Sequence, residues 1–303
     1  MIYTLTLNPA IDYVMQVKKL GFDDINRSYF EDLHFGGKGI NVSVILKRLG
    51  INNKAMGFIA GFTGEQLEKM LTVEGVACEF LKLSRGNTRI NVKIKSDTEL
   101  DINARGPEID ESEIECLIDK MQDINKDDYL VLAGSIPENL PSDIYERILS
   151  RLDNKGINFV VDTTGDMLFN VLKHKPFLIK PNHHELGDLF GVKVQSDEDI
   201  VKYAKKLQKL GAKNVLVSRG SKGATLLDEN GVISNIGILE GKVVNTVGSG
   251  DSMVAGFLAG FIDTGDYKHA LRLGAACGNA TAFCESLAQP CDIQSAYQKL
   301  KTN

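Results

Sequence analysis

The residues that point most directly to chemistry are Gly248, Ser249, Gly250 and Asp251, which stand before an apolar stripe of helical spacing ending at Ile262. Free N–H groups at a helix start can hold an anion, and glycine lets a ligand approach the backbone closely. A carboxylate beside such an anion hole could accept the proton of an acceptor hydroxyl during phosphoryl transfer. The same carboxylate could instead only stabilise the helix dipole, and the motif alone leaves both interpretations open.

This glycine turn does not match two common phosphate-binding motifs. The dinucleotide-binding pattern G-x-G-x-x-G would need glycine at position 253, where the chain has Met253. The Walker pattern G-x-x-x-x-G-K-S/T does not occur in the sequence. A dehydrogenase using NAD is further disfavoured because the turn lies near the C-terminus and not after the first strand. An anion hole beside one carboxylate remains.

A second glycine turn, HFGGKG at 34–39, precedes another amphipathic helix. Lys38 and Asn41 are three residues apart and can both face the helix mouth, while Gly37 leaves backbone exposed. A cation, an amide and open backbone suit an anionic ligand rich in hydroxyl groups. Asp12, just after the first predicted strand, could accept hydrogen bonds from two sugar hydroxyls. Each of these residues also fits an ordinary turn.

Arginine side chains are candidates for holding a phosphate, because the guanidinium group can bind it through two parallel hydrogen bonds. The candidates are Arg27, Arg89 and Arg105. Arg89 lies in the segment 88–103, where polar and apolar residues alternate as in a half-exposed strand. A solvated polar face also explains any one of these arginines.

The segment KPNHHE at 180–185 carries an N-x-x-E spacing in Asn182 and Glu185. This pair could order Mg²⁺ through water near nucleotide phosphates, because protein-bound Mg²⁺ usually keeps water ligands. The adjacent His183 and His184 do not predict zinc, since neighbouring side chains on a helix point apart and no H-E-x-x-H motif is present.

The elements that must position these residues alternate between strands and helices. Short apolar runs at 129–134, 158–163, 177–182 and 214–220 are typical of strands buried on both faces of a parallel sheet. Helical patterns occur at 111–125, 142–155 and 196–210. This alternation predicts a three-layer α/β/α, doubly wound fold. Ligands bind such sheets outside the carboxyl ends of the strands, where the candidate turns fall.

The stretches 11–35 and 88–105 interrupt this rhythm. We expect them to form a small β-sheet lid over one edge of a single domain that spans residues 1–303. No repeat, low-complexity tract or Pro/Gly linker divides the chain.

The composition and charge of the chain disfavour several classes of function. The 303 residues carry a net charge of −5, which does not favour nucleic-acid binding. The longest apolar run, at 253–262, is too short to span a bilayer, and the N-terminus lacks the basic region of a signal peptide. The five cysteines form no C-x-x-C pair, which predicts reduced thiols and a cytoplasmic protein.

In their order along nearly the whole chain, these motifs resemble the PfkB, or ribokinase-like, family of carbohydrate kinases. GGKGINVS (36–43) resembles its N-terminal signature, and NTVGSGDSMVAGFLAG (245–260) resembles its C-terminal signature. Asn245 and Ser249 replace the usual Asp and Ala of D-T-x-G-A-G-D, as is common in the phosphosugar branch. TLNPAID (6–12) and TRINVKI (88–94) are most similar to members that phosphorylate fructose 1-phosphate.

The resemblance implies a ribokinase-like fold with a mostly parallel sheet and a lid that often pairs across a homodimer. It implies transfer of the ATP γ-phosphoryl group, with Mg²⁺, to the C6 hydroxyl of fructose 1-phosphate. The alternatives are tagatose 6-phosphate, another phosphosugar, or a sugar-phosphate sensor without activity. A sensor would be expected to carry a damaged G-x-G-D motif, and here the motif is intact. No nucleic-acid or membrane partner is implied.

The family pattern also implies a role for each candidate. Asp251 is the catalytic base, and Gly248, Ser249 and Gly250 form the anion hole. The sugar side comprises Asp12, Gly37, Lys38 and Asn41, with Arg89, Lys38 and Arg27 at the substrate phosphate; Arg105 aligns only loosely. The nucleotide side comprises Lys180, Asn182, Glu185, Ser218, Gly220, Gly223, Val247, Gly248, Ser249, Gly250 and Asn279. Glu185 and Asn182 would hold Mg²⁺ through water.

Overall fold

Two sheets organise the chain in a computed structural model that describes residues 1–21, 23 and 25–300; residues 22, 24 and 301–303, which the predicted domain and lid also include, lie outside this description. Within the described residues, the large sheet has nine strands and the small sheet has four. The spatial order of the large sheet is β13 (Ile233–Ile236), β12 (Ala224–Leu227), β11 (Asn214–Ser218), β10 (Leu178–Ile179), β9 (Asn158–Asp162), β8 (Tyr129–Ala133), β1 (Ile2–Thr6), β4 (Asn53–Ala60) and β5 (Ala77–Leu83). Among these described strands, β12 pairs antiparallel with β11 and with β13, and all the other neighbouring pairs are parallel.

The apolar runs of the sequence form the central strands of this sheet. The runs at 129–134, 158–163 and 214–220 become β8, β9 and β11, and their residues are almost entirely buried. The run at 177–182 pairs over only two residues, in β10. Pro176 and Pro181 flank this short strand, and proline has no N–H to donate to a neighbouring strand.

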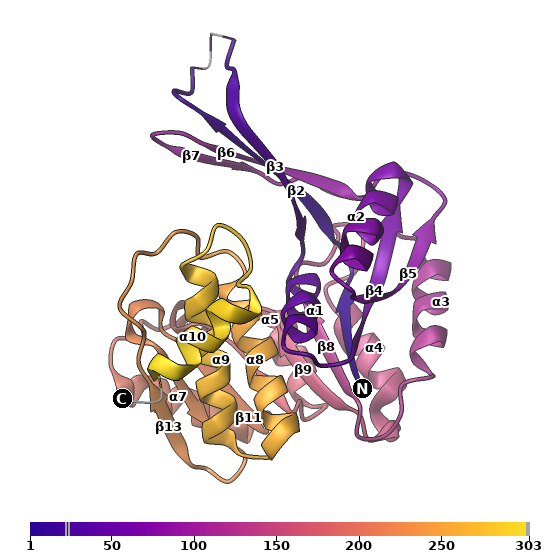
Figure 1. The fold of residues 1–303 in the computed structure, drawn as a ribbon. Helices are drawn as coiled ribbons and strands as arrows, with labels where there is room; N and C mark the ends of the chain where they lie inside the picture. Colours follow the sequence, from indigo (N-terminus) through magenta and orange to yellow (C-terminus); the bar gives the residue numbers. More distant parts are fainter. Residues whose placement is uncertain (22, 24, 301–303) are drawn as a thin grey trace.

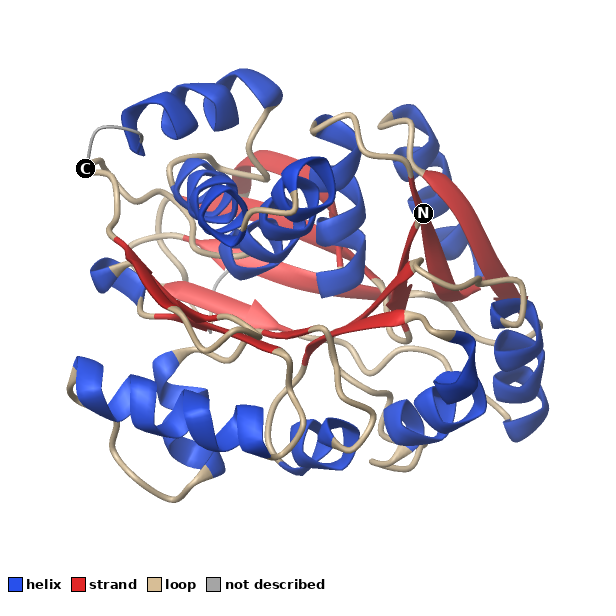
Figure 2. Ribbon diagram, turned by 90° about the horizontal axis from the view of Figure 1, so that it is seen from below, coloured by secondary structure: helices blue, strands red, loops and turns tan. Residues whose placement is uncertain are grey.

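Helices cover both faces of the large sheet, as Figure 2 shows in an edge-on view. One buried cluster joins the sheet to α1 (Lys38–Arg48), α2 (Gly61–Val73), α8 (Ser249–Thr264), α9 (Tyr267–Ala282) and α10 (Pro290–Leu300). A second cluster joins the other face to α3 (Glu111–Met121), α4 (Ile144–Leu152), α5 (Asp166–Leu172), α6 (His183–Leu189) and α7 (Asp197–Lys209). Short 3₁₀ turns occur at Asp153–Lys155 and Gly220–Lys222. The predicted three-layer α/β/α fold is thereby confirmed.

The small sheet projects from the main body (Figure 1) and has the order β3 (Ser28–Gly36), β2 (Ala10–Val17), β6 (Arg89–Lys95) and β7 (Glu99–Ile102). The two stretches that interrupt the sequence rhythm pair directly here, since β2 lies beside β6 in parallel register. On β6 the polar side is the more protected one: Asn91 is 7% exposed and Ile90 is 37% exposed. The polar side of the strand therefore faces the molecule's interior, and an apolar side faces outward.

The chain reverses its direction of travel across the sheet between β1 and β8. From β1 the sheet continues to β4 and β5 on one side, and from β8 it continues to β9 and β10 on the other. The loops that leave β1 and β8 therefore separate and leave a crevice beyond the strand ends, the usual ligand position in doubly wound sheets. Among the described residues, none of the helices has the length and apolarity needed to cross a membrane.

Candidate active site

A cavity of about 510 Å³ lies at this crevice, between the strand ends, the small sheet and the start of α8. Its lining comes from segments that are far apart in the sequence. The lining residues are Thr6, Asn8, Asp12, Gly37, Lys38, Asn41, Arg89, Asn91, Gly134, Ser135, Asp162, Lys180, Asn182, Glu185, Ser218, Val247, Gly248, Gly250 and Asp251.

Helix α8 begins at this cavity with a turn that requires glycine. Gly248 precedes the helix with φ at 79°, in the left-handed region that residues with a Cβ rarely adopt. A Cβ at this position would lie 2.6 Å from the Cδ2 atom of Leu287. No side chain caps the helix start, so its first N–H groups remain available to an anionic ligand.

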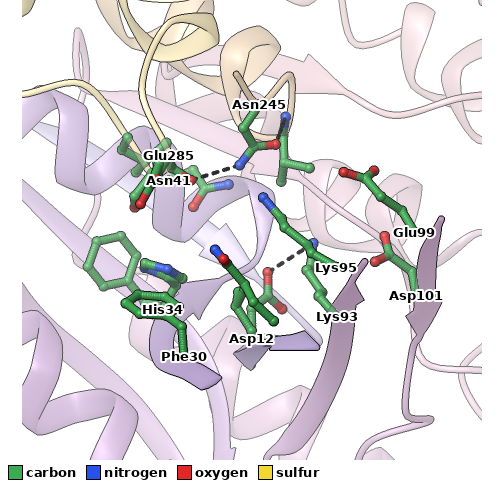
Figure 3. A pocket seen from close by; sticks show the side chains of 16 residues that line it. Asp12, Phe30, His34, Asn41, Lys93, Lys95, Glu99, Asp101, Asn245 and Glu285 are labelled. Atoms are coloured by element: carbon green, nitrogen blue, oxygen red, sulfur yellow. Dashed lines mark hydrogen bonds and ion pairs between the residues drawn. The ribbon is translucent and has the colours of Figure 1, made fainter. Parts of the chain in front are cut away.

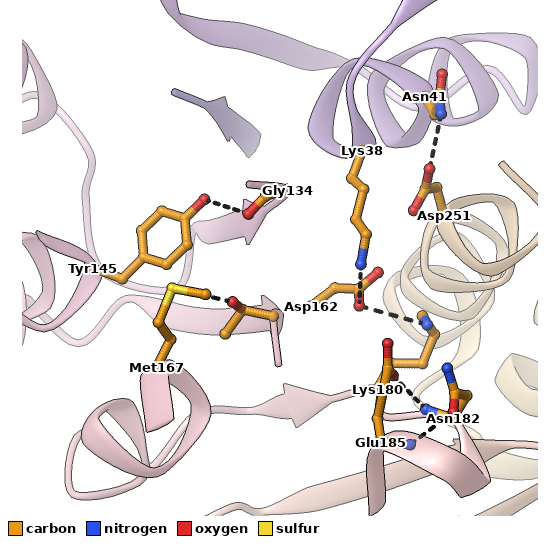
Figure 4. A network of polar contacts seen from close by, with 11 residues as sticks. Lys38, Asn41, Gly134, Tyr145, Asp162, Met167, Lys180, Asn182, Glu185 and Asp251 are labelled. Carbon is orange, nitrogen blue, oxygen red and sulfur yellow. Dashed lines mark hydrogen bonds and ion pairs between the residues drawn. The ribbon is translucent and has the colours of Figure 1, made fainter. Parts of the chain in front are cut away.

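The carboxylate of Asp251 sits in the first turn of α8 and is only 6% exposed. Asn41, on the first turn of α1, donates a hydrogen bond from Nδ2 to Asp251 Oδ2 at 2.8 Å (Figure 4). Burial, and then the neighbouring carboxylate of Asp162, raise the pKa of Asp251 to about 6; the Asn41 hydrogen bond and two lysines partly oppose this rise. A pKa near neutrality, together with the position at the anion hole, is what a general base requires.

Two lysines converge on Asp162 at the carboxyl end of β9. Lys38 Nζ donates to Asp162 Oδ1 at 3.2 Å, and Lys180 Nζ lies 3.5 Å from the same oxygen (Figure 4). Burial lowers the pKa of Lys38, but the carboxylates of Asp162 and Asp251 outweigh it and raise that pKa overall. Asp162 Oδ2 is buried without a hydrogen-bond partner in the protein. The cavity therefore holds two ammonium groups and two buried carboxylates close together.

Asn182 and Glu185 form a capping box at the start of α6. Asn182 Oδ1 accepts from the backbone N–H of Glu185 at 2.9 Å, and Glu185 Oε2 accepts from the N–H of Asn182 at 2.7 Å. These bonds leave Glu185 Oε1 for another ligand. Within the part of the chain that the structure describes, no group of three or more His, Cys, Asp or Glu side chains could hold a metal by itself. Glu185 and the unpaired Asp162 oxygen instead suit Mg²⁺ that is bound mainly by water and phosphate oxygens.

Arg89 enters the cavity from the small sheet. Its Nε donates to the backbone carbonyl of Asn8 at 3.1 Å, and its Nη1 reaches the carbonyl of Ala104 at 3.5 Å. Burial lowers the pKa of Arg89, and the nearby Asp12 partly opposes this. The two carbonyls hold the guanidinium group at the cavity wall, where it can meet an anionic group.

Comparison with known proteins identifies the family. A family model described as pfkB family carbohydrate kinase matches residues 5–294. The chain belongs to this family. The 1-phosphofructokinase of Bacillus subtilis (strain 168) is 43% identical over 301 residues, which cover 99% of each chain. The D-tagatose-1-phosphate kinase of Bacillus licheniformis is 38% identical over 289 residues, covering 95% of this chain and 94% of the relative.

A solved structure extends the likeness to three dimensions. Phosphofructokinase-2 from Escherichia coli, solved in complex with substrates and products, superimposes with a TM-score of 0.94 and 28% sequence identity. The superposition covers 99% of this chain and 99% of that one. The chain is therefore a carbohydrate kinase with the ribokinase-like fold that the sequence motifs indicated.

The cavity of this carbohydrate kinase brings together most of the residues that the sequence singled out. Of the residues predicted for the sugar side, Asp12, Gly37, Lys38, Asn41 and Arg89 line it; of those predicted for the nucleotide and phosphoryl side, Lys180, Asn182, Glu185, Ser218, Val247, Gly248, Gly250 and Asp251 line it. Arg27 lies elsewhere: it is exposed and lines a separate surface hollow with Lys18 and Lys19. Arg105 also lies outside the lining and pairs with Glu138 at 3.3 Å.

The four other candidates, Ser249, Gly220, Gly223 and Asn279, are not part of the cavity lining. Ser249 starts α8 with its Oγ buried and unpartnered, and Gly220 begins a 3₁₀ turn. Gly223 has φ at 84°, and a Cβ there would lie 1.9 Å from the carbonyl oxygen of Ile236. Asn279 fastens the loop before α8, because its Oδ1 accepts from the N–H of Leu239 at 2.9 Å while its Nδ2 donates to Ala275.

Some cavity residues were not singled out from the sequence. Asp162 follows the apolar run of β9, so its position at a strand's carboxyl end was the signal that could have identified it. Asn8, Asn91 and Ser135 also line the cavity, and their polar types alone carry no distinctive pattern.

Proposed function

We propose that this kinase transfers the γ-phosphoryl group of ATP to the C6 hydroxyl of fructose 1-phosphate, giving fructose 1,6-bisphosphate and ADP. The observation that carries the proposal is the buried carboxylate of Asp251 at the uncapped start of α8, in a cavity that also contains lysines and an arginine. The 43% identical relative named 1-phosphofructokinase supports the choice of sugar.

In this mechanism Asp251 accepts the proton of the C6 hydroxyl as that oxygen bonds to the γ-phosphorus of ATP. The bond between the γ-phosphorus and the oxygen it shares with the β-phosphate breaks, and ADP leaves. The N–H groups around Gly248–Asp251 stabilise negative charge on the moving phosphoryl group, and Lys180 adds positive charge nearby. Asn41 orients the base through its 2.8 Å hydrogen bond.

Mg²⁺, when bound with ATP, neutralises phosphate charge and orients the nucleotide. Glu185 and Asn182 would hold the Mg²⁺ ion through water ligands. Both side chains line the cavity, as does the carboxylate of Asp162. The nucleotide side of the proposal further includes Ser218, Val247 and the loops of Gly220, Gly223 and Asn279.

On the sugar side, Asp12 and Asn41 would hold hydroxyl groups, while Arg89 and Lys38 would hold the substrate phosphate. A phosphorylated sugar fits better than a neutral one because the wall carries both cations. Tagatose 1-phosphate is the second candidate, since a 38% identical relative bears that substrate in its name. It differs from fructose 1-phosphate only in the configuration of one hydroxyl group.

The proposal includes one kinase domain over residues 1–303 in which the small sheet acts as a lid, and a homodimer formed through that lid. The outward side of the small sheet exposes large apolar residues, which are Tyr29 (62%), Leu33 (46%), Ile90 (37%) and Ile102 (53%). Exposed apolar patches of this kind mark contact surfaces. Arg27 can bind substrate phosphate only if such a dimer brings it to the partner's cavity.

The proposal also includes a cytoplasmic location. The unpaired cysteines fit this location.

A coupled assay of ADP formation tests the function. It compares fructose 1-phosphate, tagatose 1-phosphate, tagatose 6-phosphate, fructose 6-phosphate and fructose, each with ATP and Mg²⁺. The proposal predicts the highest kcat/KM with fructose 1-phosphate and a much lower value with fructose. Equal use of fructose and fructose 1-phosphate would refute the phosphate-binding role of the wall. Tight sugar-phosphate binding without turnover would favour a sensor.

A further inference from the structure

We infer that Asn91 and Lys93, two side chains of strand β6, are positioning residues that fix the Asp12 carboxylate for the sugar hydroxyls. The inference rests on the proposed function, because it takes Asp12 as a sugar-binding group. It adds a reason for the position of the small sheet: strand β6 supplies the groups that orient a side chain of its neighbour, β2.

Each oxygen of the Asp12 carboxylate has its own partner on β6. Asn91 Nδ2 donates to Asp12 Oδ1 at 2.8 Å, and Lys93 Nζ lies 3.4 Å from Asp12 Oδ2 (Figure 3 shows the lysine contact). Asp12 is directly opposite Asn91 in the parallel pairing of β2 and β6, and Lys93 is two residues further along. Side chains two apart share one face of a strand, so both partners lie on the same side as Asp12.

The third strand, β3, leaves room for this arrangement. A Cβ at Gly36 would lie 2.7 Å from Asp12 Oδ1 and 3.0 Å from its Cγ. Any larger residue at position 36 would therefore displace the carboxylate from its place beside Asn91. The carboxylate is confined between β3 on one side and the two polar side chains of β6 on the other.

The hydrogen-bond pattern fixes the orientation of the Asn91 amide. A carboxylate without a proton can only accept, so the amide must present its nitrogen to Asp12. Both oxygens of Asp12 have further lone pairs, because a carboxylate offers about four acceptor positions. The two contacts thus set the plane of the group and leave acceptor positions for hydroxyl donors.

The position of Lys93 indicates that it acts through Asp12. Asp12 lines the main cavity and also a smaller neighbouring cavity of about 100 Å³, whereas Lys93 lines only the smaller one. Figure 3 shows Lys93 and Asp12 in this second cavity. The ammonium group therefore approaches the carboxylate from the side away from the main cavity. The side chain of Lys93 is 16% exposed and that of Asp12 is 13% exposed, so solvent screens this ion pair only partly.

The test is a double-mutant cycle on the full chain. Lys93→Met keeps the length of the side chain and removes its charge; with wild-type Asp12 it should raise KM for fructose 1-phosphate about 10-fold and change kcat less than about threefold. KM for ATP should stay unchanged, and Lys93→Arg should recover most of the loss. In an Asp12→Asn background the same Lys93→Met change should raise KM by less than about twofold, because the group it positions is already altered.

Lys95→Met is the matched control, since Lys95 lies on the same face of β6 and lines the same smaller cavity, while the ion pair to Asp12 comes from Lys93. It should leave KM for the sugar within about twofold of wild type. The melting temperature of each variant distinguishes a folding defect from a positioning effect. If Lys93→Met and Lys93→Arg lowered the melting temperature by the same amount, the inference would be overturned.

An equal effect of Lys93→Met in both backgrounds would also overturn it, because the lysine would then contact the substrate itself. Wild-type protein without activity on any phosphosugar would refute the proposed function, and the inference with it. Wild-type activity on a different phosphosugar leaves the cycle to be measured with that sugar, with the same expected non-additivity.

Discussion

Replacing Asp251 with asparagine separates the chemical role of this side chain from its cost to stability. The substitution keeps the size of the side chain and an oxygen that can accept from Asn41, which now lies 2.8 Å from Asp251 Oδ2. It removes the proton acceptor and a negative charge that is almost completely buried. Asp251→Asn should therefore lower kcat and raise the free energy of unfolding, so one variant tests both the catalytic role and the cost to stability.

The size of each effect follows from the structure. Loss of a general base lowers kcat by about 10²–10⁴-fold, while KM for ATP should change little. The pKa of Asp251 rises from 3.8 to about 6 in the folded protein. At about 1.4 kcal/mol for each pH unit, the ionised carboxylate destabilises the fold by about 3 kcal/mol at pH 7. Asparagine, which resembles the protonated acid, should recover up to this amount.

The pH window of the stability effect follows from the same values. The folded pKa of Asp251 lies above the unfolded one, so the native state binds the proton more tightly than the unfolded chain does. This contribution to stability is fully present at low pH and is lost as the pH rises through the interval from about 4 to about 6. The advantage of Asp251→Asn should therefore be largest at pH 7.5 and should shrink toward pH 5.

Two measurements on the wild type, Asp251→Asn and a control variant test both expected effects. Steady-state kinetics with fructose 1-phosphate gives kcat, and urea unfolding at pH 7.5 and pH 5 gives the free energy of unfolding. Asp263→Asn is the control, because Asp263 lies in the same helix and is exposed. It should change neither quantity measurably. A kcat near the wild-type value, or a marked loss of stability in Asp251→Asn at pH 7.5, would refute the reasoning.

Three further outcomes follow from the site. In wild-type protein, kcat/KM should fall on the acid side of about pH 6 as Asp251 takes up a proton, and a flat profile of kcat/KM from pH 5 to pH 8 would contradict its role as the base. Arg89→Ala should raise KM for fructose 1-phosphate at least about 10-fold with kcat within about threefold, measured beside KM for ATP as the internal control; an equal rise in both would contradict a phosphate-specific role. Gly248→Ala should lower both kcat and the melting temperature, because the residue has φ at 79° and its Cβ would lie 2.6 Å from Leu287; unchanged kinetics would show that the turn tolerates displacement.

The architecture was accessible from the sequence because buried parallel strands leave a strong signal. Continuous apolar runs such as 129–134 cannot belong to a half-exposed strand, and helical periodicity between them leaves little choice of fold class. The antiparallel strands β12 and β13 were not predicted. They are short and lie at one edge of the sheet, where β13 is largely exposed, so their pattern is weak.

The site was predictable in part. Glycine turns before amphipathic helices identified Lys38 and Asp251, because glycine and a charged residue beside an apolar helical stripe form a local pattern. Lys93 lies in the alternating segment 88–103 but was not singled out, because its contact with Asp12 joins residues that are 81 positions apart in the sequence. Contacts of this kind depend on strand pairing, and no single-sequence pattern encodes them.

The N-x-x-E segment shows how one pattern can carry two meanings. The same spacing of Asn182 and Glu185 is the signature of a capping box, and the structure contains that box at the start of α6. A metal-binding role for these side chains must therefore coexist with a role in starting the helix. Substitution of Asn182 or Glu185 therefore affects metal binding and helix initiation together, and the kinetic effect of the variant combines the two.

The hydrogen bond between Asn41 and Asp251 joins residues 210 positions apart in the sequence. One partner lies on the first helix of the chain and the other on the eighth, so the contact can form only after both halves of the large sheet have assembled. Loop-closure entropy makes such long-range contacts late events in folding. During synthesis, the amino-terminal helix must wait for the last quarter of the chain to leave the ribosome before the base has its partner. The pairing of Asn41 with Asp251 is therefore among the last contacts of the fold to be completed.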